Sequence, residues 1–135
     1  MSDIEDIREQ KREELRQRVA EEPEADGGAT APDEPVHVEG ESHLRELVGE
    51  HDVVLVDFYA DWCGPCQMLA PTLAEVAADT DAAVAKVDID AHQGLAAEYN
   101  VQGVPTVLLF SGGEPAERVV GVRGKDEYVG LVEAH

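Results

Sequence analysis

The two cysteines of the chain, Cys63 and Cys66, are separated by two residues. A thiolate is the reactive form of cysteine, and unpaired N–H groups and the dipole at a helix N-terminus stabilise it. A helix predicted from Cys63 places that residue at the N-terminus, partly exposed, with Cys66 one turn inward and buried. Gly64 lets the backbone bend, and Pro65 fixes φ where the first helical turn loses no hydrogen bond. This spacing suits a dithiol that opens and closes reversibly.

Two other uses of such a pair are a zinc site and an inert structural disulfide. Zinc needs about four ligands, commonly from two Cys-x-x-Cys units or from added histidines. The chain has no second cysteine pair, and its histidines have no ligand spacing: His37, His43, His51, His92 and His135. A structural disulfide that closes one short loop, without other cysteines, is also not favoured. We therefore expect no metal and no cofactor besides a redox-active disulfide.

A carboxylate precedes the cysteines in an unusual place. Asp57 lies inside the apolar run Val53–Tyr59, which is typical of a strand buried on both faces. Burial of a charge costs several kcal/mol unless it is compensated, and it raises the pKa of a carboxyl group. Asp57 can therefore exchange protons near neutral pH. The alternative is a charge that is satisfied at the end of the strand.

Three separated motifs together resemble the thioredoxin family. They are Val56-Asp57-Phe58, Trp62-Cys63-Gly64-Pro65-Cys66 and, downstream, Gly103-Val104-Pro105-Thr106. A Cys-x-x-Cys beside a βαβ pattern is a known pointer to this family. The resemblance extends from Val36 to the C-terminus and leaves the first 35 residues unexplained.

The resemblance implies a role for each residue of the redox site. Cys63 attacks a substrate disulfide, and Cys66 then resolves the mixed disulfide. Asp57 lies behind Cys66 and acts as its general acid and base, through water in one version of the mechanism. Lys86, on the next strand, pairs with Asp57, although an ordinary lysine that extends its amine to water is the alternative.

The resemblance also implies a docking patch for substrates. A cis bond before Pro105 brings the backbone of Val104 beside the cysteines, ready to pair with an extended segment. The expected substrate-binding residues are Trp62, Gly64, Pro65, Val104, Pro105 and Gly121. For Trp62 the alternative is a place in the core. Two departures from the family, Gln67 and Tyr59, put the redox potential in doubt.

The elements expected around these motifs predict an α/β protein. Strands are expected at 36–38, 53–59, 84–89, 106–110 and 118–122, with a turn at 111–114. Helices are expected from the cap Ser42 to about Gly49, at 63–79 with Pro71 inside it, at 93–99 and at 125–134. The alternating elements predict parallel strands, and the last two strands predict an antiparallel hairpin. The expected result is a thioredoxin fold with a mixed sheet of about five strands and helices on both faces.

The first 35 residues are expected to lie outside this domain. Residues 1–22 are rich in Glu and Arg with few apolar positions, which indicates a marginal, solvated helix or a charged tail. Residues 23–35 contain three prolines and two adjacent glycines, as a linker does. We therefore expect an extension and linker over 1–35 and one thioredoxin domain over 36–135.

The charge of the chain limits its partners and its setting. Thirty Asp and Glu against ten Lys and Arg give a formal net charge of −20. Such a surface should bind neither nucleic acid nor anionic membranes, and it favours a salt-accumulating cell over an ordinary cytoplasm. The sequence lacks a long apolar run and a secretory signal, so we expect a cytoplasmic monomer.

The combined prediction is a cytoplasmic protein-disulfide reductase. It would receive electrons from a thioredoxin reductase-like donor and pass them to disulfide-bearing proteins. A disulfide isomerase or oxidant is one alternative. The other is a redox adaptor whose N-terminal segment recruits a partner.

Overall fold

The structure, a computed structural model, describes residues 30–135. The predicted helix over 1–22 lies outside the described residues, as does most of the predicted linker. The described part contains one sheet with the strand order β1-β3-β2-β4-β5. Its strands are β1 (Val36–His37), β2 (Val53–Tyr59), β3 (Ala83–Asp88), β4 (Thr106–Ser111) and β5 (Glu114–Val120). Its helices are α2 (Glu41–Glu50), α3 (Gly64–Asp79), α4 (Gln93–Glu98) and α5 (Lys125–Glu133).

Strand β2 occupies the centre of the sheet. It pairs in parallel with β3 and antiparallel with β4, while β1 lies at one edge beside β3 and β5 at the other edge beside β4. A central strand has both faces covered, which explains its nearly continuous apolar sequence. The predicted bounds of β2, the parallel unit and the antiparallel hairpin are confirmed.

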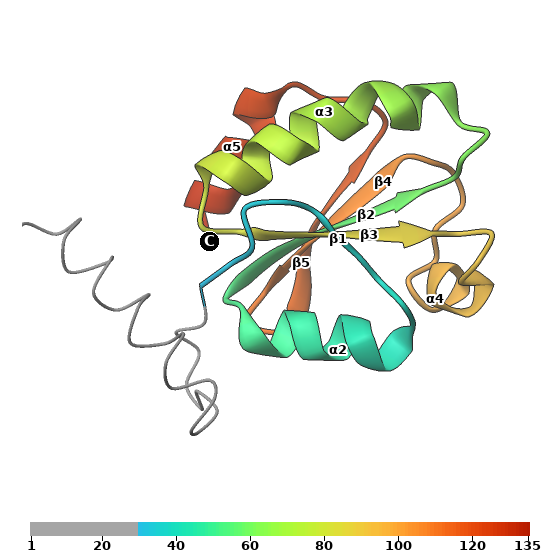
Figure 1. Ribbon diagram of the computed structural model, residues 1–135, viewed down its shortest axis with the longest axis horizontal. Helices are drawn as coiled ribbons and strands as arrows, with labels where there is room; N and C mark the ends of the chain where they lie inside the picture. The colour runs from blue at the N-terminus through green and yellow to red at the C-terminus, as the bar shows by residue number, and fades with distance from the viewer. Residues whose placement is uncertain (1–29) are drawn as a thin grey trace, which may run out of the picture.

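Helices cover both faces of the sheet. Figure 1 shows α3 and α5 on one side and α2 and α4 on the other. Successive side chains of a strand point to opposite faces, so β2 serves both layers in alternation. Its Val54, Val56 and Phe58 belong to the core beneath α2, whereas Leu55 belongs to the core beneath α3. The predicted mixed sheet between helices is therefore confirmed.

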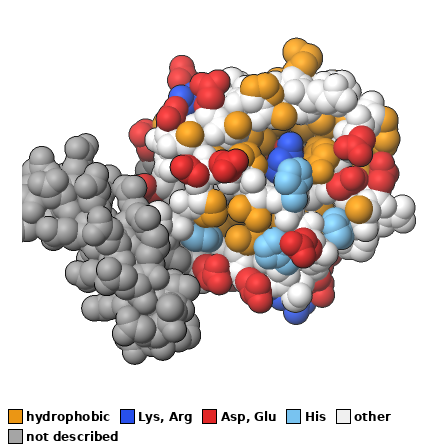
Figure 2. Space-filling model, in the orientation of Figure 1, with side chains coloured by type: hydrophobic (Ala, Val, Ile, Leu, Met, Phe, Trp, Pro, Cys, Tyr) orange, Lys and Arg blue, Asp and Glu red, His pale blue; other side chains and the backbone are white. Residues whose placement is uncertain are grey.

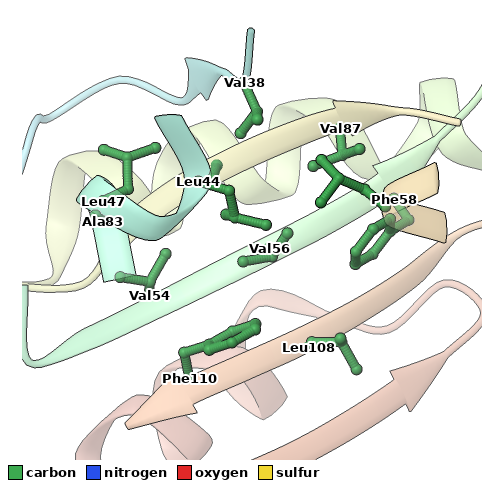
Figure 3. Packing of buried hydrophobic residues seen from close by; sticks show 12 residues of the cluster. Val38, Leu44, Leu47, Val54, Val56, Phe58, Ala83, Val87, Leu108 and Phe110 are labelled. Atoms are coloured by element: carbon green, nitrogen blue, oxygen red, sulfur yellow. The ribbon is translucent and has the colours of Figure 1, made fainter. Parts of the chain in front are cut away.

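The buried members of the core on the α2 side are apolar, and Tyr99 packs against them at the margin. Figure 3 shows Phe58 and Phe110 from neighbouring strands directed toward the same layer as Leu44 of α2. The buried members are Val38, Leu44, Leu47, Val54, Val56, Phe58, Ala83, Ala85, Val87, Leu95, Leu108 and Phe110. Ala31, within the predicted linker, packs against this core as well.

The core on the α3 side has side chains of similar size but a different chemistry. Its buried members are Leu55, Leu69, Leu73, Val76, Ala77, Val84, Val107, Leu109, Val119 and Tyr128. By strand alternation, Asp57 and Lys86 point to this same face. Pro71 lies inside α3, as predicted. Polar groups are therefore embedded in the layer that packs beneath α3, the helix that contains Cys66.

Two predicted boundaries were wrong. Helix α2 begins at Glu41 after Gly40 and has no side-chain cap, so Ser42 lies inside the helix. The acidic side chain of Glu41 in the first turn favours this start through the helix dipole. Strand β5 begins at Glu114, because Gly112 and Gly113 both adopt positive φ and close a two-residue turn.

The surface carries many acidic side chains. On the face drawn in Figure 2, Asp and Glu are spread over the molecule, and Lys and Arg are few. Hydrophobic and His side chains gather in the middle of this face.

Within residues 30–135, no helix combines the length and the apolar composition that a membrane crossing requires.

Candidate active site

Both cysteines lie where the central strand passes into the longest described helix. Strand β2 ends at Tyr59, and α3 begins at Gly64 with Cys63 as its N-cap. Cys63 and Cys66 form a disulfide, and their Cα atoms are 5.3 Å apart. Pro65 occupies the first helical turn, where its missing N–H removes no hydrogen bond. The predicted position of the pair is confirmed.

The sulfur of Cys63 receives a hydrogen bond that a thiolate would also receive. The backbone N–H of Cys66 donates to Cys63 Sγ at 3.2 Å, in the position of an N-cap acceptor. The N–H of Cys63 itself donates to the carbonyl of Ala60 at 3.1 Å and fixes the entry into the helix. A donated N–H and the positive end of the helix dipole both stabilise negative charge on this sulfur.

The prediction that Cys63 is partly exposed was wrong. Cys63 is 4% exposed and Cys66 is 3% exposed. The backbone carbonyl of Val104 lies 3.7 Å from Cys63 Sγ, a contact rather than a hydrogen bond because a disulfide sulfur has no proton. Tyr59 and Ile89 also pack against the pair. A helix N-terminus alone would leave the Cys63 sulfur exposed to solvent, but residues from outside the helix cover it.

The loop that covers Cys63 has the predicted geometry. The Val104–Pro105 peptide bond is cis, as predicted. The hydroxyl of Thr106 donates to the carbonyl of Gly103 at 2.6 Å. The N–H of Gly121, a residue with positive φ, donates to the carbonyl of Pro105 at 2.9 Å. Gly121 is therefore adjacent to the loop, although it is far away in the sequence.

Trp62 lies on the surface rather than in the core. Its side chain is 69% exposed, which excludes the core alternative. Its indole Nε1–H donates to Asp90 Oδ2 at 2.9 Å. Sequence reasoning missed Asp90, although the carboxyl ends of parallel β2 and β3 lie at the same edge and could have indicated it.

Other predicted docking residues surround the disulfide. Gly64 and Pro65 are exposed, Val104 is half-buried and Pro105 is buried. Three further large apolar side chains are exposed among the described residues: Met68 at 70%, Val120 at 55% and Val122 at 38%. Single exposed apolar residues are ordinary, but here two of them flank Gly121. We call Trp62, Gly64, Pro65, Val104 and Gly121 the docking surface.

Asp57 is completely buried at the fifth position of β2. Burial raises its pKa from 3.8 to about 6, and the positive charge of Lys86 opposes that increase. Lys86 Nζ lies 3.8 Å from Asp57 Oδ2, too far for a hydrogen bond but close enough for attraction between charges. Neither carboxyl oxygen has a hydrogen-bond partner among the described residues. The alternative of a charge satisfied at the strand end is therefore wrong.

Lys86 is held between Asp57 and an aromatic ring. The two residues are register partners on β2 and β3, and the Lys86 side chain is only 13% exposed. Its Nζ lies 4.6 Å from the centroid of the Tyr59 ring, within the range of a cation–π interaction. Both contacts hold the amine at the buried carboxyl, unlike a lysine that extends its amine fully into water.

Gln67 follows Cys66 and makes a local contact. Its Nε2 donates to the backbone carbonyl of Asp61 at 3.0 Å. Within the part of the chain that the structure describes, no group of three or more His, Cys, Asp or Glu side chains is arranged to hold a metal ion.

The chain resembles known proteins over this same region. The Thioredoxin family model matches residues 34–134. A thioredoxin of Mycobacterium bovis is 42% identical over 92 residues, which cover 67% of this chain and 79% of that protein. A bifunctional thioredoxin reductase/thioredoxin of Mycobacterium leprae is also 42% identical, but the match spans only 20% of its length.

A solved structure agrees with these sequence relationships. A mutant thioredoxin of Halobacterium salinarum NRC-1 superposes with a TM-score of 0.76 at 52% identity, covering 79% of this chain and 95% of that one. The family match includes β2, both cysteines and the cis proline loop. The chain therefore belongs to the thioredoxin family of disulfide reductases, with Cys63 and Cys66 as its thiol–disulfide pair.

Proposed function

We propose that this protein reduces disulfides of other proteins in the cytoplasm through its Cys63-Gly64-Pro65-Cys66 dithiol. The hydrogen bond from the Cys66 N–H to Cys63 Sγ is the observation that carries the proposal. It favours a thiolate at Cys63, which is the form that attacks a disulfide. No cofactor is needed, because the dithiol itself holds the two electrons that the reaction transfers.

The reaction proceeds through two thiol–disulfide exchanges. The Cys63 thiolate attacks one sulfur of the substrate disulfide, and the other substrate sulfur leaves as a thiolate that takes up a proton. The Cys66 thiol then loses its proton and attacks Cys63 Sγ, which breaks the bond to the remaining substrate sulfur. The substrate gains two thiols, and the protein ends with the Cys63–Cys66 disulfide.

Asp57 serves the second exchange as the base for Cys66. Its pKa of about 6 leaves it mostly ionised at neutral pH, yet close enough to neutrality to return the proton when the disulfide is reduced again. Lys86 keeps the carboxyl from becoming neutral through its charge 3.8 Å away. Asp57 shares the α3 face of the sheet with the first turn of α3, which supports this role.

Substrates bind at the docking surface as extended segments. The Val104 carbonyl, beside Cys63, accepts a hydrogen bond from the backbone of such a segment. The exposed face of Trp62, whose indole is fixed by Asp90, supplies apolar contact on the other side of the disulfide. Backbone recognition of this kind accepts substrates of varied sequence.

The electron donor is a protein of the thioredoxin reductase type. A homologue in Mycobacterium leprae bears the name of both a reductase and a thioredoxin, which supports this partner. The net charge of −20 argues against partners of negative charge, such as nucleic acid and anionic membranes. The same charge, and the similarity to a Halobacterium protein, support a monomer adapted to a salt-rich cytoplasm.

The decisive experiment arrests the cycle between its two exchanges. Cys66→Ser should attack a disulfide of insulin and then stop, because serine cannot displace the bound thiol. Mass spectrometry of the variant should show the added mass of the disulfide-linked insulin, and dithiothreitol should remove that added mass. The same variant, immobilised in lysate, should retain physiological substrates for identification by mass spectrometry.

Cys63→Ser is the matched control, because it retains one cysteine in the same site. Both sulfurs are almost equally buried, so their exposure cannot decide which one attacks. The hydrogen bond at Cys63 Sγ predicts that Cys63→Ser forms far less complex. Equal capture by both variants, or capture by neither, would overturn the assignment of Cys63 as nucleophile.

A further inference from the structure

Tyr128 places a second polar group in the apolar layer that contains Asp57. This residue of α5 is completely buried and is the largest fully buried side chain in the described residues. It packs in the core beneath α3, together with Leu55 and Val107. Its hydroxyl has no hydrogen-bond partner among the described residues. A buried tyrosine hydroxyl normally finds such a partner, so this one needs an explanation.

Asp57 lies in the same layer and also lacks a hydrogen-bond partner. Its register partners are Lys86 on β3 and Val107 on β4, and Val107 pairs in turn with Val119 on β5. Val107 and Val119 belong to the cluster that contains Tyr128. Tyr128 therefore faces the cross-strand row in which Asp57 stands.

Electrostatic coupling agrees with this placement. Burial raises the pKa of Tyr128 to about 12, and the negative charge of Asp57 is the next cause of that increase. Glu127 raises the pKa further, while Arg123 lowers it through its charge and its backbone N–H. That N–H lies outside hydrogen-bond geometry, and it could only donate to the hydroxyl oxygen, so the hydroxyl proton has no acceptor among the described residues. The charge of Asp57 thus acts on the phenol across the apolar layer.

We propose that Tyr128 is a positioning residue that stabilises the ionised form of Asp57 by donating its hydroxyl proton toward the carboxylate. The donation passes through one bridging water, or becomes direct when the side chains move, because no direct bond exists in this structure. A hydrogen bond to a charged carboxylate lowers its pKa. Tyr128 and Lys86 therefore oppose, from α5 and β3, the effect of burial on Asp57.

The inference rests on the proposed role of Asp57 and makes it more specific. If Asp57 accepts the proton of Cys66, the hydroxyl of Tyr128 sets the pH above which Cys66 can attack. The titratable groups that act on Asp57 are Lys86 from β3, Tyr59 from its own strand and Tyr128 from α5, and the proposed mechanism adds Cys66 from α3. Among these, only Lys86 carries a positive charge, so the hydroxyl is the second stabilising group.

Tyr128→Phe in the full chain tests the proposal, because it removes the hydroxyl and keeps the ring. The pKa of the Asp57 carboxyl, followed by carbon NMR in the oxidised protein, should rise by about one pH unit. At pH 6 the ionised fraction would fall, so the attack of Cys66 should slow by roughly fivefold, with equal rates above about pH 8. A purely structural role would lower the rate equally at all pH values.

Tyr99→Phe is the matched control on the opposite face of the sheet. Tyr99 packs against Phe58 and Phe110 in the core on the α2 side, and removal of its hydroxyl should leave the Asp57 titration unchanged. An Asp57 pKa in Tyr128→Phe that equals or falls below that of the unmodified protein would overturn the proposal. The pKa measurement stands even if Asp57 has no part in turnover, so the two proposals fail separately.

A second measurement uses the unmodified protein, so the test does not depend on whether Tyr128→Phe folds. The carbon signal next to the Tyr128 hydroxyl should shift with the same midpoint as the Asp57 carboxyl. Asp57→Asn should abolish that shift. A Tyr128 signal that stays constant while Asp57 titrates would contradict the proposal.

Discussion

The two faces of one strand show opposite solutions to burial. Toward α2, β2 presents Val54, Val56 and Phe58 to a core whose buried members are apolar. Toward α3, the same strand presents Leu55 and then Asp57, whose carboxyl oxygens have no hydrogen-bond partner among the described residues. The first face stabilises the fold by removing apolar surface from water. The second gives up part of that stability, because it buries a carboxyl group whose only nearby opposite charge among the described residues is Lys86.

The difference between the two faces indicates that the polar groups of this small fold are concentrated on the side of the sheet that supports α3. Both faces bury aromatic rings, Phe58 on one and Tyr128 on the other. Only the α3 face combines a ring with a hydroxyl, a carboxylate and the Lys86 amine, and only this face supports the helix that begins at the disulfide. Substitutions on the two faces should therefore differ in sign and in pH dependence.

The largest effect is expected on the apolar face. Phe58→Ala removes a fully buried ring from a packed layer, and should reduce the free energy of unfolding by about 3–5 kcal/mol. The loss should be the same at pH 4 and pH 7, because the buried side chains that pack around Phe58 are apolar. Urea unfolding measures it, with Phe58→Leu as the milder control. A loss that changes with pH would show that the two faces are not separate.

Asp57→Asn should have the opposite sign. Folding raises this pKa from 3.8 to about 6, so the folded protein binds the proton more tightly than the unfolded chain does. The stability that protonation supplies is complete below about pH 4 and is lost as the pH rises through about 6. The uncharged amide should therefore stabilise the protein at pH 7 by up to roughly 3 kcal/mol, and should give almost nothing at pH 3.5.

The same variant should slow the attack of Cys66 by about tenfold or more, because its base is removed. Stopped-flow release of the mixed disulfide measures this step, and urea unfolding at both pH values measures the stability. A gain in stability that persists at pH 3.5 would refute the raised pKa. Unchanged turnover between pH 6 and pH 8 would refute the acid–base role.

Salt should screen the charges on the surface and should have little effect on the interactions in the two cores. Screening of the −20 charge in molar KCl should stabilise the fold by about 1–2 kcal/mol and raise Tm by several degrees. The gain from Asp57→Asn should remain constant across that range, since buried charges are screened far less. Calorimetry of the unmodified protein and of Asp57→Asn, from low to molar KCl, measures both the rise in Tm and the difference in stability between the two proteins. A flat or falling Tm would contradict adaptation to salt.

Removal of the N-terminal extension should have the smallest effect. A chain that begins at Pro35 loses the packing of Ala31 on the α2 side, a contact of one small side chain. It should reduce insulin disulfides at nearly the rate of the full chain, because no described contact links that edge to the cysteines. A chain that begins at Thr30 is the control. A several-fold loss would make the extension part of the catalytic unit, and selective loss of partner binding would favour the adaptor alternative.

Local sequence was sufficient wherever the signal is short in range. The continuous apolar run predicted the bounds of β2, and Gly112 with Gly113 predicted the hairpin turn. The spacing of Cys63 and Cys66 around Pro65 predicted a helix N-terminus at the disulfide. An aspartate inside an apolar run predicted a buried carboxyl with a raised pKa. Periodicity, turn chemistry and helix-end preferences act over a few residues and can be read directly.

Local sequence failed where the context of an element decides its boundary. Ser42 is a good cap, yet α2 begins at Glu41, where the first turn gains an acidic side chain. The predicted strand at 118–122 begins earlier, at Glu114, and includes Pro115. This strand lies at the sheet edge, where a missing N–H is tolerated. The position of a strand in the sheet decides whether a proline is allowed there, and that position is not a local property.

Only the tertiary structure decided what surrounds the reacting sulfurs. Cys63 is covered by Val104, forty-one residues later in the chain. Asp90 holds Trp62, and Tyr128 reaches the layer of Asp57 from the last helix. Each of these contacts joins segments that are far apart in the chain, and side-chain packing between them depends on the sheet order that brings the segments together. The sequence by itself indicated which groups are candidates for the reaction, and the fold determined how exposed, how charged and how well positioned those groups are.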